Sequence, residues 1–428
     1  MTADYKTLQS TPKAPPDAVR VPRVESLTGL RWWAAFFVFT HHMSNLAPLP
    51  IAGFLRLGLT GVTFFFALSG FVLTWSASPA VGTGRFYWRR VARIGPSHLV
   101  ATLLAIPVFY ALSSSPGQPW VRPFDLAAIA LSVVLLQGWS GVYAVHFAGN
   151  PAAWTLSVEA FFYAGHPLYN RILRRATPQV ALGAAAVLMV GDAVAWRYWP
   201  AMGTLPAPVL HLPAFLLGMM LATAMRAGWR PRMPTPVAVA LLGAGFVTIW
   251  QAGVHPHAPG AGLVNSVRLP LLAVLYAVVI VAAAARDLTG RRSVLRSRPL
   301  VALGQWSYGF YLIHATLVYA VRSVTGMFPI GWSNLAIYAG LLVPSALAAW
   351  ALYTWVERPA ERRLRSLSVR SGHDRSSLRS GHDRSRRGAR RVRSQRDPGR
   401  HRSSGTDQGS DRGSHRGAEA GPAVTLDT

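Results

Sequence analysis

The chain has 428 residues, of which 51% are hydrophobic and 14% are charged, and its mean hydropathy is positive. A soluble domain usually carries about a quarter charged residues, so this composition excludes an ordinary soluble enzyme. The formal net charge is +27, but outside the C-terminal tail it lies mostly in short segments between apolar runs, so we expect no nucleic-acid partner. Cysteine is absent, which excludes disulfides and thiolate metal sites.

The first apolar segment carries an arginine and a histidine. The first 23 residues lack the apolar core of a signal peptide, so we expect a cytoplasmic N-terminal segment over residues 1–26 and an uncleaved first membrane helix. Charged or titratable side chains are costly inside a membrane and usually belong to a pathway or a reaction site. Eleven residues of helix return to nearly the same face about 16 Å further along. Arg31 and His42 therefore share one stripe of this helix, whereas His41 points elsewhere.

Further apolar segments follow along the chain, most of them close to the roughly 20 residues that a membrane span requires. They are residues 58–76, 96–113, 180–196, 210–227, 236–252, 269–285, 300–320 and 335–356, and the run that begins at Trp154 and carries Glu159 is a further one. Short basic connections between them are typical of the cytoplasmic side of a membrane. These connections are residues 85–93, 171–175, 226–232 and 286–298.

The apolar run 124–137 decides the topology. It has 14 residues, and counting it as a full span would put the later basic connections on the wrong side of the membrane. We therefore predict ten spans, with this run re-entrant or interfacial inside an external excursion over residues 114–153. Both termini are then cytoplasmic, and the protein is a multi-pass protein of the plasma membrane.

The predicted fold is an all-α integral membrane protein: a polytopic bundle of about ten transmembrane helices over residues 27–364. Residues 365–428 are rich in Arg, Ser and Gly and have almost no apolar side chains, so we expect a disordered cytoplasmic tail. The heptapeptide 370–376 is repeated at 379–385. We interpret its His-Asp pairs as low-complexity duplication and expect no metal site. Anionic lipid headgroups are the expected contact of this tail.

Three arginines stand close together after the second span. Arg89, Arg90 and Arg93 place three guanidinium groups within five residues, which suits a phosphorylated ligand because the planar fork binds phosphate oxygens bidentately. The alternative is ordinary charge that sets the topology.

Two apolar runs are interrupted by residues of other kinds. Glu159 is the only acidic residue of its run, which predicts a functional acid just inside the external end of its helix or an ion pair with a neighbouring arginine. Ser69 and Gly70 are small, and we interpret them as a point where two helices approach closely.

The ninth span carries a row of polar groups. Ser307, Tyr308, Tyr311 and His314 lie within eight residues, and the spacings of three and four place most of them on one helix face. This row is the candidate substrate pocket, and simple packing is the alternative interpretation of His314.

In order and spacing, these blocks resemble acyltransferase family 3, the integral-membrane acyltransferases that O-acylate sugars and sugar-bearing metabolites. The resemblance covers about residues 23–363. Its blocks are Leu-x-Gly-Leu-Arg with Arg-x10-His, Phe-Phe-x-Leu-Ser-Gly-Phe, Arg-Arg-x-x-Arg, Trp-x-Leu-Ser-Val-Glu and Ser-Tyr-x-x-Tyr-Leu-Ile-His. No block alone is specific for the family, but their order and spacing together are.

The resemblance implies catalytic roles for Arg31 and His42 and an acyl-CoA donor at the three clustered arginines. This chain departs from the family pattern at Thr28 and Trp32, where the family has aspartate and glycine. Either the carboxylate is dispensable or Glu25 substitutes for it, and Trp32 is expected to reshape the pocket.

The predicted function is transfer of an acyl group, acetyl by default, from cytosolic acyl-CoA to a hydroxyl of a carbohydrate or glycosylated metabolite, without a permanently bound cofactor. In this hypothesis His42 takes the acceptor proton, Glu159 orients its imidazole, and Arg31 binds the donor or stabilises the oxyanion. A covalent acyl-histidine is an alternative route. The rival classes are a transporter or flippase, for which we find no internal repeat, and a non-catalytic membrane scaffold.

Overall fold

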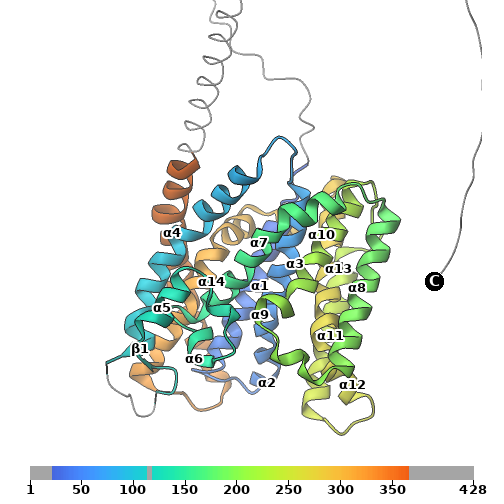
Figure 1. Ribbon diagram of the computed structural model, residues 1–428. Helices are drawn as coiled ribbons and strands as arrows, with labels where there is room; N and C mark the ends of the chain where they lie inside the picture. Colours follow the sequence, from blue (N-terminus) through green and yellow to red (C-terminus); the bar gives the residue numbers. More distant parts are fainter. Residues whose placement is uncertain (1–21, 113–117, 366–428) are drawn as a thin grey trace, which may run out of the picture. The chain divides into compact units, whose positions relative to one another are not determined.

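The computed structural model describes residues 22–112 and 118–365, which form a bundle of long helices running to and fro between two ends (Figure 1). Ten helices of this part of the chain have at least 15 residues. They are α1 (Ser26–Met43), α3 (Gly61–Trp75), α4 (Thr83–Phe109), α7 (Trp154–Leu173), α8 (Pro178–Tyr198), α10 (Leu212–Arg226), α11 (Thr235–Val254), α13 (Arg268–Leu288), α14 (Arg298–Thr325) and α15 (Leu335–Ala351). The predicted tail lies outside the described residues.

Short elements connect these helices. They are α2 (Ala52–Leu55), η1 (Arg56–Thr60), α5 (Leu126–Val133), η2 (Gln137–Trp139), α6 (Tyr143–His146), η3 (Pro151–Ala153), η4 (Pro200–Thr204), α9 (Ala207–Leu210), α12 (Ala261–Ser266), η5 (Val294–Arg296), η6 (Trp332–Asn334) and the π-helix η7 (Leu352–Glu357), which continues α15. Two strands of two residues each, β1 (Tyr110–Ala111) and β2 (Arg122–Pro123), pair in parallel. The protein is therefore an all-α, multi-pass membrane protein, as the sequence predicts.

Seven helical stretches of the described chain are long and apolar enough to cross a membrane. They contain seven of the ten long helices, and the three that remain are α1, α7 and α14. These three carry Arg31, Glu159 and the polar row of the ninth predicted span, so the helices with the weakest membrane signal carry most of the predicted site residues. α5, within the short run 124–137, has eight residues, too few for a span of about 20.

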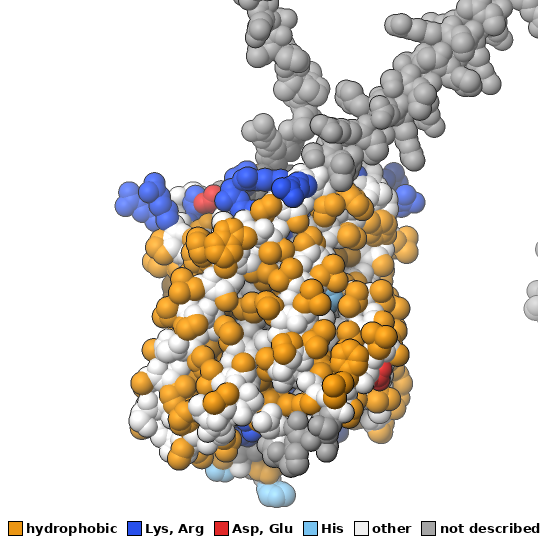
Figure 2. All heavy atoms as spheres, turned by 90° about the vertical axis from the view of Figure 1, so that its left-hand side faces the viewer, with side chains coloured by type: hydrophobic (Ala, Val, Ile, Leu, Met, Phe, Trp, Pro, Cys, Tyr) orange, Lys and Arg blue, Asp and Glu red, His pale blue; other side chains and the backbone are white. Residues whose placement is uncertain are grey.

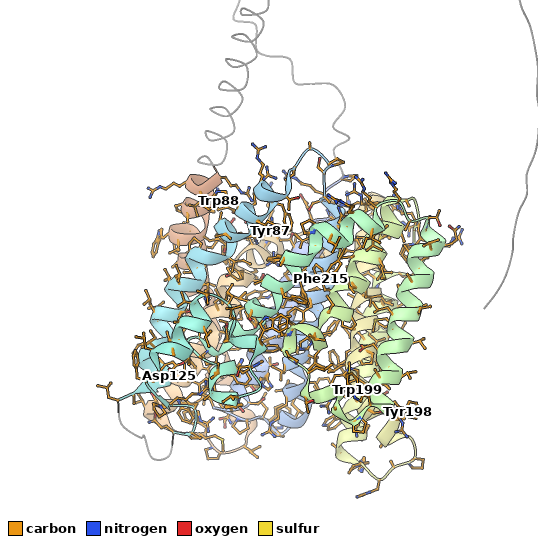
Figure 3. All side chains as sticks on the ribbon, in the orientation of Figure 1. Tyr87, Trp88, Asp125, Tyr198, Trp199 and Phe215 are labelled. Carbon is orange, nitrogen blue, oxygen red and sulfur yellow. The ribbon has the colours of Figure 1, made fainter. Side chains whose placement is uncertain are left out.

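Arginines gather at one end of the bundle, and hydrophobic side chains cover the wall below them (Figure 2). The connections α3–α4, α7–α8, α10–α11 and α13–α14 lie at this end, which we call the basic end (Figure 1). Tyr87 and Trp88 lie near it, whereas Tyr198 and Trp199 lie near the opposite end (Figure 3). Aromatic side chains at both ends of an apolar wall are typical of the two membrane interfaces.

The structure corrects one boundary. We expected residues 85–93 to form a loop, but they belong to the first half of α4, which begins at Thr83 after the extended residue Gly82. Pro96 lies inside this helix, where it removes one backbone hydrogen bond without ending the helix. The helical register matters for the site, because residues three apart share a face and adjacent residues do not.

Two glycines let α3 and α10 come into close contact. A Cβ atom at Gly70 would collide with the carbonyl of Phe215, and a Cβ at Gly218 would collide with the carbonyl of Ala67. Phe215 lies in the middle of the bundle (Figure 3). The packing interpretation of Gly70 is confirmed, and this crossing fixes α3 beside the site described below.

The N-terminus of α1 receives a carboxylate from α13. The backbone N–H and hydroxyl of Ser26 donate hydrogen bonds of 2.7 and 2.6 Å to Asp287. A negative charge is favourable at this end of a helix. Glu25 instead forms an ion pair with Arg296 at 3.6 Å. The carboxylate that meets the start of α1 is therefore that of Asp287 from α13, and the substitution of Glu25 for the carboxylate absent at Thr28 stays a prediction.

We predict that Gly70→Ala and Gly218→Ala each lower stability by about 1–3 kcal/mol, because the added methyl group meets backbone that has no room to move. Thermal unfolding in detergent, followed by intrinsic fluorescence, measures this. Gly183→Ala on α8 is the matched control, since a Cβ at Gly183 meets nothing within 4 Å. Equal melting temperatures for all three variants would contradict the tight crossing.

Candidate active site

A cavity of about 320 Å³ lies among α1, α3, α4, α7 and α14. We call it the central cavity. Seven of the ten predicted site residues line it, namely Arg31, Arg90, Arg93, Glu159, Ser307, Tyr308 and Tyr311. The other three, Arg89, His42 and His314, do not. The fold thus brings together residues that are far apart in the sequence, as expected for a site of chemistry.

The cavity is strongly cationic. Arg31, Arg90, Arg93 and Arg365 line it, and Glu159 is the one acidic residue of its lining. Positive charge concentrated in a cleft with low-dielectric walls attracts anions, because the walls focus the field. The lining therefore favours an anionic ligand or a reaction that develops negative charge.

Arg31 has no protein partner for its charge. Its side chain makes no hydrogen bond or ion pair with any described residue, although it lies close enough to Arg93, Glu357 and Glu159 to interact electrostatically. An unpaired charge in such surroundings costs stability. A group of opposite charge entering the cavity would remove that cost.

Trp32 is a different case. We expected it to reshape the pocket, but it is buried away from the cavity lining and its ring meets Phe310 edge-on at 5.0 Å. The next residue on a helix points about 100° away. Trp32 therefore faces the core between α1 and α14 and not the ligand space.

The clustered arginines divide according to the helical register of α4. Arg90 and Arg93, three apart, face the central cavity, whereas Arg89 lines a second cavity at the basic end. The guanidinium of Arg90 lies 5.9 Å from the ring centres of Phe86 and Tyr163, a favourable cation–π distance. Arg93 forms an ion pair with Glu357 at 3.7 Å.

Glu357 is a residue that the sequence interpretation missed. Its side chain is only 1% exposed, both carboxylate oxygens lack a hydrogen bond, and it is the last residue of the π-helix η7. Turns of π-helix frequently occur at functional sites. The available signal was an acid placed directly after the last apolar span and directly before Arg358.

Glu159 differs from its expected position. It accepts hydrogen bonds from Ser69 Oγ at 2.9 Å and from the hydroxyl of Tyr163 at 2.8 Å. No contact joins it to His42 among the described residues. Glu159 instead lines the central cavity together with Arg31, whereas His42 lies outside it.

His42 and His314 form a pair outside the central cavity. Their ring centres are 5.2 Å apart, and His42 Nδ1 and His314 Nε2 are both buried without a hydrogen bond. His314 Nδ1 lies 2.7 Å from the carbonyl of Phe310, so it carries the proton. His41 instead lies 3.0 Å from the carbonyl of Arg56 and points elsewhere, as expected.

The polar row of α14 connects the two parts of the site. Tyr311 lines the cavity, and its ring centre is 6.1 Å from that of His314. The hydroxyl of Tyr308 donates to the carbonyl of Ile94, and that of Ser307 donates to Gly304 within its own helix. These hydroxyls are satisfied, so they shape the wall of the cavity and fix α14 against its neighbours.

We predict strong coupling between Arg93 and Glu357. Removing one member of a buried ion pair leaves an uncompensated charge, so Arg93→Gln and Glu357→Gln should each destabilise the protein, and the double variant by less than their sum. We expect a coupling energy of about 1–3 kcal/mol from thermal unfolding. The half-exposed pair Glu25–Arg296 is the control, with an expected coupling below about 1 kcal/mol. Equal coupling in the two pairs would contradict a buried role for Glu357.

Comparison with known proteins identifies the family of this chain. The model of an acyltransferase domain, that of acyltransferase family 3, matches residues 24–354. "Acyltransferase MdmB" of Streptomyces mycarofaciens is 32% identical over 380 residues, covering 82% of this chain and 94% of the relative. "Nodulation protein 10" of Rhizobium leguminosarum bv. viciae is 25% identical over 380 residues, covering 80% and 94%. No solved structure matches. The chain therefore belongs to acyltransferase family 3 and is a membrane-embedded acyltransferase.

Proposed function

We propose that the protein transfers an acyl group, acetyl in the simplest case, from cytosolic acyl-CoA to a hydroxyl of a carbohydrate or a glycosylated metabolite. In this proposal the protein lies in the plasma membrane with its basic end on the cytosolic side. Both termini are then cytoplasmic. One observation carries the proposal: Arg31 is unpaired in a cavity that Arg90 and Arg93 also line.

The cavity suits the donor side of such a reaction. Acyl-CoA carries phosphates, and attack on its thioester develops an oxyanion. Guanidinium groups bind both kinds of oxygen through charge-assisted hydrogen bonds. Arg93 is held by Glu357, whereas Arg31 has no competing partner and is free to bind an anionic group of the donor.

The histidine pair suits the acceptor side. His314 donates from Nδ1 to the carbonyl of Phe310, which leaves its Nε2 as an acceptor facing the neighbouring imidazole. Neither His42 Nδ1 nor His314 Nε2 has a hydrogen-bond partner in the described part of the structure. In this proposal the two atoms come into hydrogen-bond contact when substrates bind, so that His42 Nδ1 donates and His42 Nε2 is unprotonated. That is the form in which a general base takes a proton from a hydroxyl. His314 is then a positioning residue, and it replaces Glu159 in the orienting role that the sequence suggested.

We expect His42→Ala to abolish acyl transfer while the protein stays folded in the membrane, because the base is lost and its imidazole makes no hydrogen bond that supports the fold. The assay uses purified protein in nanodiscs with radiolabelled acetyl-CoA and a panel of simple sugars. His41→Ala is the matched control, since the adjacent imidazole points to Arg56. Full activity of His42→Ala would exclude this role.

A second prediction concerns Arg31. Arg31→Gln should lower kcat/KM for acetyl-CoA about tenfold or more, because a charge-assisted contact with the donor is lost. The same change should raise the melting temperature, because it removes a charge that has no partner in the folded protein. Turnover is measured in nanodiscs and unfolding in detergent. Loss of both activity and stability would show that Arg31 supports the fold instead.

A further inference from the structure

A second cavity, of about 430 Å³, lies at the basic end between the ends of α3, α7 and α10 and the first turns of α4. We call it the basic cavity. Five arginines line it, Arg89, Arg90, Arg171, Arg174 and Arg226. No Asp or Glu of the described residues contributes to its lining. Three of these arginines, Arg171, Arg174 and Arg226, have no role in the site described above.

The two cavities adjoin each other. Leu73, Ser76 and Arg90 line both of them. A long ligand held at the basic end can therefore extend past Arg90 toward Arg31 without leaving the protein. Ser76 directly follows the last residue of α3, and its small side chain leaves room between the two cavities.

The arginines of the basic cavity differ in what holds them. Nη1 of Arg226 donates to the carbonyls of Thr74, Trp75 and Ala77, which fixes it on the C-terminal end of α3. That arginine has a structural partner. The side chains of Arg171 and Arg174 form no hydrogen bond or ion pair with any described residue, so their guanidinium groups are available to a ligand.

We propose that the basic cavity binds the phosphorylated nucleotide end of the acyl-CoA donor, with Arg171 and Arg174 as phosphate ligands. The inference rests on the proposed function and extends it. Residues three apart at the end of α7 present their forks side by side, and a planar guanidinium matches phosphate oxygens bidentately. The pantetheine arm then passes Arg90 and brings the thioester into the central cavity.

The alternative interpretation is that these arginines only set the membrane topology, but such charges need not line a cavity. Other arginines at the same end of the protein serve as matched controls. Arg175 follows Arg174 directly, and Arg291 lies in the connection between α13 and α14. Both are exposed at the basic end and line neither cavity. A phosphate could also come from an anionic lipid headgroup, so the experiment separates the two sources.

The experiment compares Arg171→Gln/Arg174→Gln with Arg175→Gln/Arg291→Gln in phosphatidylcholine nanodiscs. Each pair removes two positive charges from the same end of the protein. The donors are acetyl-CoA and S-acetylpantetheine, which carries the thioester without phosphates or nucleotide. We expect the first pair to raise the KM for acetyl-CoA about tenfold or more, since charge-assisted contacts are lost. Its KM for S-acetylpantetheine and both constants of the control pair should stay unchanged.

A direct binding measurement completes the test. Adenosine 3′,5′-bisphosphate should bind the wild type and the control pair equally and the Arg171→Gln/Arg174→Gln variant more weakly.

Equal KM values and equal binding in the two pairs would overturn the inference while leaving wild-type turnover, and so the proposed function, intact. Loss of phosphatidylglycerol binding without loss of nucleotide binding would identify a lipid site and overturn it too. If the wild type binds the bisphosphate but does not use acetyl-CoA as a donor, the proposed function is wrong, whereas the basic cavity remains a nucleotide-binding site.

Discussion

The cost of holding guanidinium groups inside a low-dielectric bundle governs this structure. Three of the four arginines of the central cavity meet that cost differently: Arg93 through an ion pair with Glu357, Arg90 through two aromatic rings, and Arg31 through no described hydrogen bond or ion pair. A buried ion pair roughly balances its desolvation, whereas an unpaired charge does not. The folded protein therefore stores unfavourable energy at one point, and an anion at that point releases it.

The same cost explains how the helices are arranged. α1, α7 and α14 carry the polar groups of the site and fall below the apolarity that a lipid-facing span needs. They must be shielded from lipid by the other helices, because lipid offers no partner to a charged side chain. α8, α11 and α15 show the complementary pattern, with 17%, 22% and 28% of their apolar windows buried inside the protein. Exposed apolar wall and charged interior are two consequences of one constraint.

The sequence predicts most of the fold because the relevant signals are local. Apolar length gives ten long helices, and the basic connections give the end at which each helix turns. The sequence also predicts that Arg31, Arg93 and Glu159 are functional residues, because each is a charged residue in or beside an apolar run. Which groups meet is harder to predict, since it depends on depth and register. Glu159 meets Ser69 and Tyr163 in the central cavity and not His42, and this pairing has no sequence signal of its own.

Register explains the remaining differences. Once residues 85–93 are helical, Arg90 and Arg93 must face one way and Arg89 another, but a loop assignment hides that division. Glu357 was missed because it stands among charged residues at the end of the last span, where acids are common and usually solvated. Its burial follows from the π-helix η7, whose wider turn shifts the side chains after it relative to an α-helix.

The Ser69-Gly70 pair shows why packing and chemistry cannot be separated in this bundle. Gly70 lets α3 approach the backbone of α10, and this contact fixes the rotation of α3 about its axis. That rotation turns the adjacent Ser69 toward α7, where its hydroxyl donates to Glu159. A larger residue at the glycine would separate the helices and move the serine away from the carboxylate as well. One motif thus holds the bundle together on one face and orients the single acidic group of the cavity lining on the other.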